Sequence, residues 1–241
     1  MPIIPATALI ELAPKGILNA AINLGNPVLA QLGADGQPQG VSVALAKALA
    51  RELGVELQMI TYDAAGKVFA ALAGGQWTLA FLAIEPVREQ EIAFSAPYVI
   101  IEGTYLVDAD SKLKDVADLD RAGLRIAVGK GAAYDLYLSR TLQHAELVRA
   151  DTSAAAVDLF IEQKLDAAAG VRQPLEKAAA ADGHYRVLDG HFTAIRQAMA
   201  VPIQCTAAAA YVSGFIERQK ANGLVAQALA DSGQSPLLVA P

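Results

Sequence analysis

The stretch LAIEPVREQEIAFSAPYVI, residues 82–100, contains one arginine and three glutamates between two apolar runs. Arg88 follows the apolar segment 79–84, which predicts a strand. Ligands of open α/β sheets bind at the carboxyl ends of strands, and a guanidinium suits bidentate recognition of a carboxylate. The stretch therefore favours a ligand-binding role for Arg88. The alternative is a surface ion pair with Glu85, Glu89 or Glu91, worth about 0–1 kcal/mol.

Segments of strand type and helix type alternate before this stretch, as in a parallel sheet covered by helices. Ser42 is a candidate N-cap and Gly54 a terminator for the first helix, and Asp63 is a candidate cap for the second. The predicted elements form a β-α-β-α-β unit: a strand at 16–25, a helix at 41–53, a strand at 55–62, a helix at 64–75 and a strand at 77–84.

The same pattern restarts in the second half of the chain. Residues 124–142 predict a strand, a glycine turn and a helix, and residues 151–171 predict a capped helix followed by a strand. Residues 214–234 predict helices with no local partner, which we expect to pack back on the first lobe. The second lobe would then be an insertion into the first.

Composition excludes several classes of function. The chain has 241 residues and a net charge of −6 without a Lys and Arg cluster, which argues against nucleic-acid binding. No apolar run approaches the roughly 18 residues of a membrane span. The single cysteine, Cys205, allows no intramolecular disulfide and no thiol cluster for a metal. Without a G-x-S-x-G elbow a hydrolase is disfavoured, and the histidines show no metal spacing: His144, His184 and His191.

Residues 1–16 have neither a basic leading region nor a clean cleavage site, so they do not match a secretory signal. Either a signal was removed, or the protein is cytoplasmic.

The turn Gly129-Lys130-Gly131 follows a predicted strand and resembles the opening of a dinucleotide-binding fingerprint. Tyr134 stands where that fingerprint has its third glycine, which disfavours a dinucleotide, and we expect no cofactor. Free amides at the start of a helix can still form an anion-binding nest. An ordinary strand-to-helix turn is the alternative.

Residues 82–98 closely resemble a segment of the type 2 periplasmic solute-binding proteins, in the amino-acid family of ABC transporters (family 3). Its usual form is T-x-x-x-x-R followed by F-S-x-P-Y. The resemblance extends to residues 40–57, 118–138 and 159–171, so it covers nearly the whole chain.

The resemblance implies an α/β fold with two lobes, each a mostly parallel sheet flanked by helices. Lobe 1 would comprise residues 1–105 and 201–241, and lobe 2 residues 106–200. Two hinge strands, near Tyr105–Val107 and Ala198–Val201, would let the lobes close on a small molecule. The protein would then be the monomeric, non-enzymatic binding component of a periplasmic ABC importer, with a membrane permease as its partner.

Residue by residue, the resemblance assigns Arg88 to the ligand's α-carboxylate. The family's hydroxyl five residues earlier is Ala83 here. The hydroxyls usual after the glycine of the second lobe, Gly131, are Ala132 and Ala133. Carboxylate binding would then depend on Arg88 and backbone amides.

The positions expected to hold the ligand's amino group depart further from the family. Asn23 and Gly170 or Val171 stand where the family commonly has acidic residues. An ammonium buried without a counter-charge costs several kcal/mol, roughly. Arg172 would add a second positive group, which favours an amine-free carboxylate or a dicarboxylate.

Three further residues complete the predicted site. Glu102 supports the opposite alternative, since it would pair with a ligand amine. Phe81 and Asn26 are candidates for packing and polar contacts with the ligand, although Phe81 would serve equally well in the core.

Two other classes of function stay open. Cyclohexadienyl dehydratases use this fold and need a carboxylic acid over the substrate ring, for which Glu85 and Glu102 are the candidates. A sensor domain would pass its closure to a separate partner protein.

Overall fold

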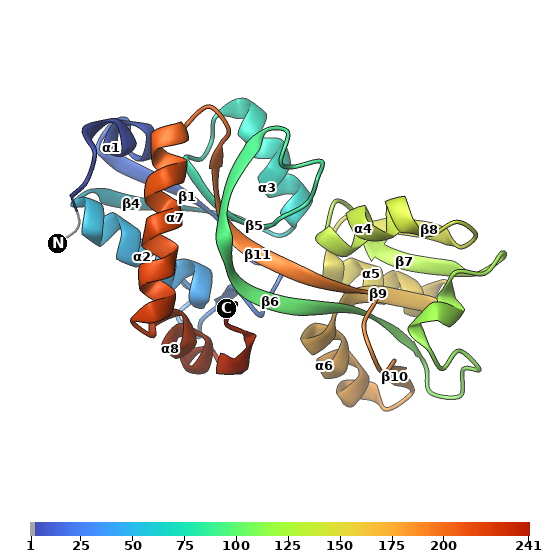
Figure 1. Ribbon diagram of the computed structural model, residues 1–241. Helices are drawn as coiled ribbons and strands as arrows, with labels where there is room; N and C mark the ends of the chain where they lie inside the picture. Colours follow the sequence, from blue (N-terminus) through green and yellow to red (C-terminus); the bar gives the residue numbers. More distant parts are fainter. Residues whose placement is uncertain (1–2) are drawn as a thin grey trace. The chain divides into compact units, whose positions relative to one another are not determined.

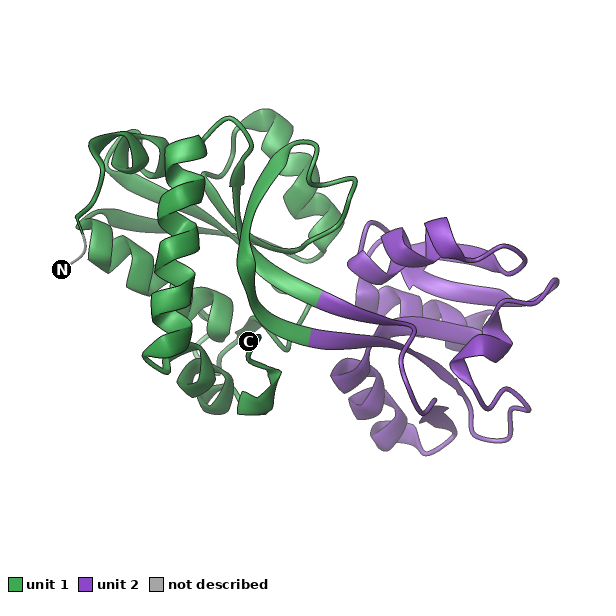
Figure 2. Cartoon of the chain, in the orientation of Figure 1, with its two compact units in different colours: residues 1–100, 196–241 green, residues 101–195 purple. Residues whose placement is uncertain are grey.

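The computed structural model describes residues 3–241, which fall into two compact units. Unit 1 comprises the residues up to Ile100 together with Arg196–Pro241, and unit 2 comprises Ile101–Ile195 (Figure 2). The boundaries lie a few residues before the predicted ones, at 105 and 200. Each boundary falls inside a long strand, β6 (Ile92–Asp108) or β11 (Thr193–Pro202). The chain therefore passes from one unit to the other in extended conformation both times.

The strands of unit 1 follow the order β4-β1-β5-β11 (Figure 1). They are β1 (Ile17–Asn23), β4 (Glu56–Tyr62), β5 (Leu79–Ala83) and β11. β1 pairs in parallel with β4 along its whole length and with β5 at its centre, whereas β11 runs antiparallel to β5. The predicted β-α-β-α-β unit is confirmed.

The described residues of unit 1, 3–100 and 196–241, contain five α-helices. They are α1 (Ala6–Leu12), α2 (Val41–Leu53), α3 (Ala65–Ala71), α7 (Thr206–Ala221) and α8 (Leu224–Asp231). α7 and α8 pack on α1 and α2, and so join the amino-terminal half of the chain (Figure 1). A short hairpin of β2 (Gln31–Leu32) and β3 (Pro38–Gln39) and two 3-10 turns, Leu72–Gly74 and Pro236–Leu238, complete the unit. The first two residues of the segment 1–16 lie outside the described residues.

Two predicted helix caps are wrong. Gly40 is the N-cap of α2, so Ser42 lies inside the first turn, where it is buried and its hydroxyl meets the Tyr98 hydroxyl at 3.2 Å. Ala64 is the N-cap of α3, and Asp63 is hydrogen-bonded to Lys67 instead. The predicted terminator of α2 is confirmed, because Gly54 adopts the left-handed conformation with φ of 69°.

Unit 2 contains the strand order β6-β9-β7-β8, with β10 on the other edge of β6. These strands are β7 (Arg125–Gly129), β8 (Glu146–Ala150), β9 (Ala167–Val171) and β10 (Tyr185–Val187). β7 is parallel to β8 and β9, while β9 and β10 are antiparallel to β6. The helices are α4 (Ala133–Thr141), α5 (Ser153–Glu162), α6 (Arg172–Asp182) and a 3-10 turn at Val116–Leu119.

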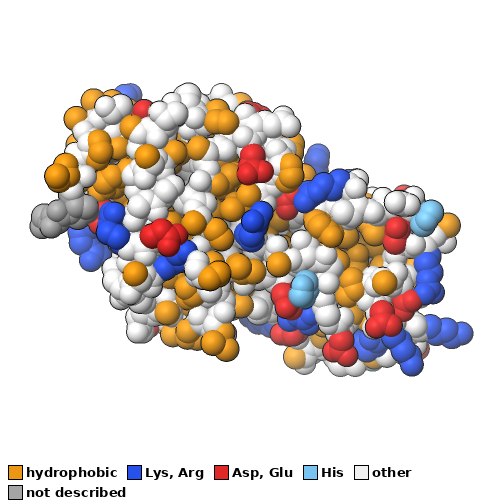
Figure 3. Space-filling view, viewed as in Figure 1, with side chains coloured by type: hydrophobic (Ala, Val, Ile, Leu, Met, Phe, Trp, Pro, Cys, Tyr) orange, Lys and Arg blue, Asp and Glu red, His pale blue; other side chains and the backbone are white. Residues whose placement is uncertain are grey.

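Each unit has its own apolar core. In unit 1, Trp77 is buried under α3 and donates its indole N–H to the Val68 carbonyl at 2.9 Å. In unit 2, Phe160 of α5 packs on the sheet with Leu106 and Leu175. Among residues 3–241, no helix is both long and apolar enough to cross a membrane. Charged side chains of both signs are mixed with apolar ones on the face shown in Figure 3.

Candidate functional site

Arg88 lies in the turn that follows β5, where its backbone N–H donates to the Glu85 carbonyl at 2.8 Å. Its side chain has no exposed surface, and its Nη1 donates to the Ala83 carbonyl at 2.9 Å. Burial lowers the pKa of Arg88 to about 10, because the charged form loses its hydration, and the negative charge of Glu85 opposes that decrease. The guanidinium is therefore not at the surface, where the alternative placed an ion pair, although the charge of Glu85 acts on it inside unit 1.

Phe81 and Ala83, the other two predicted residues on this strand, are also buried in unit 1. The Phe81 ring meets the Tyr98 ring edge-on, with centroids 6.1 Å apart and planes at 89°. Phe81 therefore occupies the core position that its sequence context allowed. Ala83 contributes its backbone carbonyl to Arg88.

Asn23 and Asn26 shape the loop that follows β1. The Asn23 Oδ1 accepts the Gly25 N–H at 3.0 Å, and the Asn26 Oδ1 accepts the Val28 N–H at 3.3 Å. Gly25 is required here, because a Cβ at this position would lie 2.2 Å from the Asp63 carbonyl oxygen. In this structure both asparagine oxygens brace the loop of unit 1.

The predicted anion nest of unit 2 is occupied by the chain itself. The Gly131 N–H donates to the Asp135 carboxylate at 2.8 Å, while the Lys130 and Ala132 N–H groups donate to the carbonyls of Ala150 and Gly129. Ala132 and Ala133 are buried where α4 begins. The three amides of the turn thus have three different acceptors, and the amide at position 131 already binds the Asp135 carboxylate.

Asp135 is a residue that the sequence analysis missed. Its side chain is 4% exposed and is held by Arg149, whose Nη2 lies 3.0 Å from Oδ1 and whose Nε donates to the same oxygen at 3.1 Å. The available signal was an acidic residue in the first turn of a helix directly after a glycine turn.

Glu102 and Arg172, predicted from opposite arguments, contact each other in unit 2. The Arg172 Nε donates to the Glu102 Oε2 at 2.5 Å. The other carboxylate oxygen, Oε1, lies 3.2 Å from the His191 Nδ1. Glu102 and Arg172 therefore form one charge cluster with His191, a histidine that no spacing pattern connects with them.

This cluster borders the segment 188–192, which precedes β11. The Arg172 guanidinium also donates to the carbonyls of Gly190 and, at 3.5 Å, Leu188. Phe192 stacks on Tyr137 with centroids 5.9 Å apart and contacts Tyr105 at 4.7 Å. A charged cluster and an aromatic cluster thus lie side by side along one segment.

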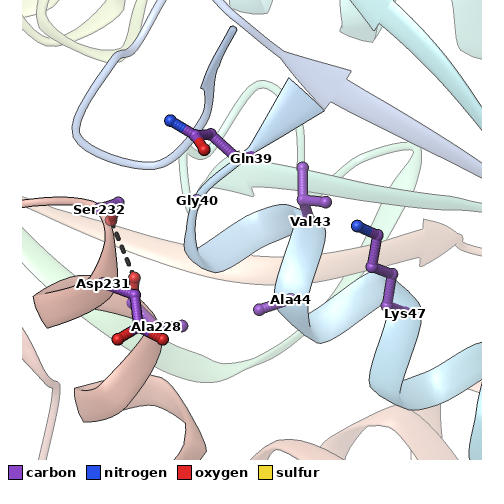
Figure 4. Close-up of a pocket in the computed structure, with 8 residues that line it drawn as sticks. All are labelled: Gln39, Gly40, Val43, Ala44, Lys47, Ala228, Asp231 and Ser232. Atoms are coloured by element: carbon purple, nitrogen blue, oxygen red, sulfur yellow. Dashed lines mark hydrogen bonds between the residues drawn. The ribbon is translucent and has the colours of Figure 1, made fainter. Parts of the chain in front are cut away.

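A separate pocket of about 210 Å³ lies between α2 and α8 in unit 1 (Figure 4). It is lined by small side chains, among them Ala44 and Ala228, and by the charged side chains of Lys47 and Asp231. None of the predicted ligand-binding residues lines it. Within the described part of the chain, no group of three or more His, Cys, Asp or Glu side chains is placed to hold a metal ion.

The family model of the bacterial extracellular solute-binding proteins, family 3, matches residues 18–231 of the chain. The chain belongs to this family. The α/β fold of this family 3 protein is shared with solved structures of amino-acid-binding proteins.

One similar structure is a mutant of ArgBP from T. maritima, which has a TM-score of 0.81 and 22% identity over 94% of this chain and 99% of that one. The solute receptor for L-cysteine of Neisseria gonorrhoeae has a TM-score of 0.81 and 21% identity over 95% and 93%. The ancestral amino-acid-binding protein AncCDT-1, a precursor of cyclohexadienyl dehydratase, has a TM-score of 0.78 and 24% identity over 92% and 98%. At these identities the likeness shows the fold.

Proposed function

We propose that this family 3 solute-binding protein captures a small carboxylate-bearing solute and delivers it to the permease of an ABC importer in the periplasm. Family membership supports a binding protein over an enzyme, since the family consists mainly of non-enzymatic binding proteins. Similar folds bind arginine and L-cysteine, both of which carry a carboxylate.

The observation that carries this proposal is Arg88, an arginine without exposed surface at the carboxyl end of the central strand β5. Burying a guanidinium is costly, and its pKa is lowered accordingly. Charged groups that are buried with perturbed pKa values are concentrated at functional sites. A ligand carboxylate is the partner that a guanidinium fork binds best.

The residues proposed to face the amino group of a ligand favour a ligand whose carboxylate has no adjacent amine. Asn23 is neutral and braces its own loop, and Glu102 is paired with Arg172. An ammonium group would therefore meet no acidic side chain at Asn23. At Glu102 it would meet a carboxylate that Arg172 already neutralises. We propose an organic acid as the preferred ligand, with amino acids as weaker ligands.

A thermal-shift screen of proteinogenic amino acids and matched amine-free mono- and dicarboxylates tests the proposal. Ligand at about 1,000 times its dissociation constant stabilises the folded protein by about 4 kcal/mol, which is readily measured. The shift should disappear in Arg88→Gln and persist in the control Arg196→Gln, which removes the same charge from an exposed site of unit 1.

Because Arg88 is buried, its replacement can also weaken the fold. Arg88→Lys retains the charge without the planar fork and separates the two effects, since it should fold but bind carboxylates less tightly. An Arg88→Gln protein that is folded and gives the same shift as the wild type would contradict the role of Arg88.

A second candidate function is an enzyme of the cyclohexadienyl dehydratase type. It is favoured by Glu85, a buried carboxyl side chain whose charge acts on Arg88 and which is one of the two carboxyl groups predicted to serve such an enzyme. Turnover of prephenate or arogenate by the purified protein, lost in Glu85→Gln, would establish this function over solute capture.

A further inference from the structure

The two members of the Glu102–Arg172 pair are held very differently. Arg172 is tied to the main chain, because its guanidinium donates to the carbonyls of Gly190 and Leu188 as well as to Glu102. Its side chain is 21% exposed. The position of Arg172 is therefore determined by the backbone of the segment 188–192.

Glu102 is held through side chains and is the more exposed partner. Its carboxylate contacts Arg172 through one oxygen and His191 through the other, and its side chain is 42% exposed. The His191 side chain is itself 46% exposed. A flexible, half-exposed carboxylate can leave a fixed guanidinium at little cost, whereas the reverse movement would break the contacts to backbone carbonyls.

The place of Arg172 in the fold also favours an anion. Arg172 is the first residue of α6, an 11-residue helix whose N-cap, Val171, makes no side-chain capping hydrogen bond. The start of a helix carries a partial positive charge, so a guanidinium there adds to a potential that is already positive. The Glu102 carboxylate offsets both charges, and Glu176 Oε1 lies at 3.7 Å from Nη1.

We propose that Glu102 is a built-in occupant of an anion site at Arg172, and that a carboxylate of the bound solute takes its place. This inference rests on the proposed function and names the group of the solute that unit 2 recognises, a carboxylate bound by Arg172. An amine at this end of the ligand is disfavoured, because the anchored positive charge of Arg172 would repel it.

The competition can be measured with succinate as the probe, by isothermal titration calorimetry of Glu102→Gln. If Glu102 occupies Arg172 about nine-tenths of the time, its removal should tighten succinate binding by about tenfold. The matched control is Glu176→Gln, which removes the same charge near the same guanidinium but leaves the occupant in place. We expect the control to change the affinity less than about twofold, because Glu176 is an exposed i,i+4 partner.

Arg172→Lys completes the design, since it keeps the positive charge but lacks the fork that reaches both Glu102 and the Gly190 carbonyl. The gain from Glu102→Gln should vanish in the Arg172→Lys background. The Arg172 Nε–H resonance of Glu102→Gln should also shift during the succinate titration.

Equal gains in Glu102→Gln and Glu176→Gln would overturn the proposal, because they would reflect bulk charge only. So would a Glu102→Gln protein that binds none of the α,ω-dicarboxylates from malonate to adipate. If carboxylate binding depends on Arg88 but on neither Glu102 nor Arg172, the proposed function stands and the displacement fails. If Glu102→Gln tightens succinate binding while Arg88→Gln has no effect, the displacement stands and the role of Arg88 fails.

Discussion

Asp135 is expected to hold the turn that begins α4, and Asp135→Ala should therefore destabilise unit 2. The carboxylate accepts the Gly131 N–H and contacts Arg149, whereas the Ser139 hydroxyl donates at 2.6 Å to the Asp135 backbone carbonyl, which the substitution leaves in place. A hydrogen bond to a charged group contributes about 1.5–3 kcal/mol. The ion pair adds only about 0–1 kcal/mol, since the Arg149 side chain is 42% exposed.

These terms are not additive, and the expected loss is about 2–4 kcal/mol. Amide hydrogen exchange at Gly131 is the appropriate assay, because a loss of about 2 kcal/mol accelerates exchange through local opening by about 30-fold. Trp77, the single tryptophan, is buried in unit 1, so its fluorescence reports on the unit that is not mutated.

The control is Asp158→Ala on the exposed face of α5, which removes the same charge from the same unit. Asp135→Asn retains one oxygen and most of the shape, so it should cost about half as much as Asp135→Ala. If Asp135→Ala loses no more stability than the control, or if Gly131 exchange is unchanged, the carboxylate does not hold the turn.

Two further predictions concern backbone positions. Gly25→Ala places a Cβ 2.2 Å from the Asp63 carbonyl oxygen and should destabilise unit 1 by about 1–3 kcal/mol, as measured by denaturant unfolding. The matched control, Gly214→Ala inside α7, should instead stabilise unit 1 by about 0.5–1 kcal/mol. A Gly25→Ala protein as stable as the wild type would show that the loop after β1 can shift. Hydrogen bonds from the amides of residues 143–145 lower the pKa of Asp120 below its ordinary 3.8. The stability that the ionised Asp120 contributes to the fold is therefore present above pH 3.8 and is lost as the pH falls through the folded-state pKa. The protection of these amides, taken relative to their intrinsic exchange rates, should fall in Asp120→Asn at pH 7 and in the wild type as the pH is lowered through the folded-state pKa of Asp120, and unchanged protection in both cases would contradict this role.

Much of the fold was predictable because its determinants are local. Alternating strand and helix patterns predicted the β-α-β-α-β unit, and Gly54 was correctly expected to end α2. The two predicted helix caps were wrong, although both residues have the side-chain chemistry of a cap. Ser42 and Asp63 are suitable capping residues, but α2 begins before Ser42 and α3 begins after Ala64, and the core contact with Tyr98 uses the Ser42 hydroxyl instead.

The candidate site was predictable only in part, because a side chain's partner depends on the rest of the fold. The position of Arg88 after a strand was evident from the sequence, whereas its complete burial was not. The glycine turn was predicted to form an anion nest, but its amide at Gly131 is bound by the carboxylate of Asp135 in the following helix, and its neighbouring amides bind backbone carbonyls.

The sequence by itself determined the family, the order of the elements and the place of Arg88, since these depend on motifs and on periodicity along the chain. Only the tertiary structure decided that Glu102 and Arg172, which appeared to favour opposite ligands, neutralise each other. The physical reason is the register of two antiparallel strands. Gly103 of β6 pairs with Val171 of β9, so the residues next to them, one before and one after, are brought together although 70 positions separate them in the chain.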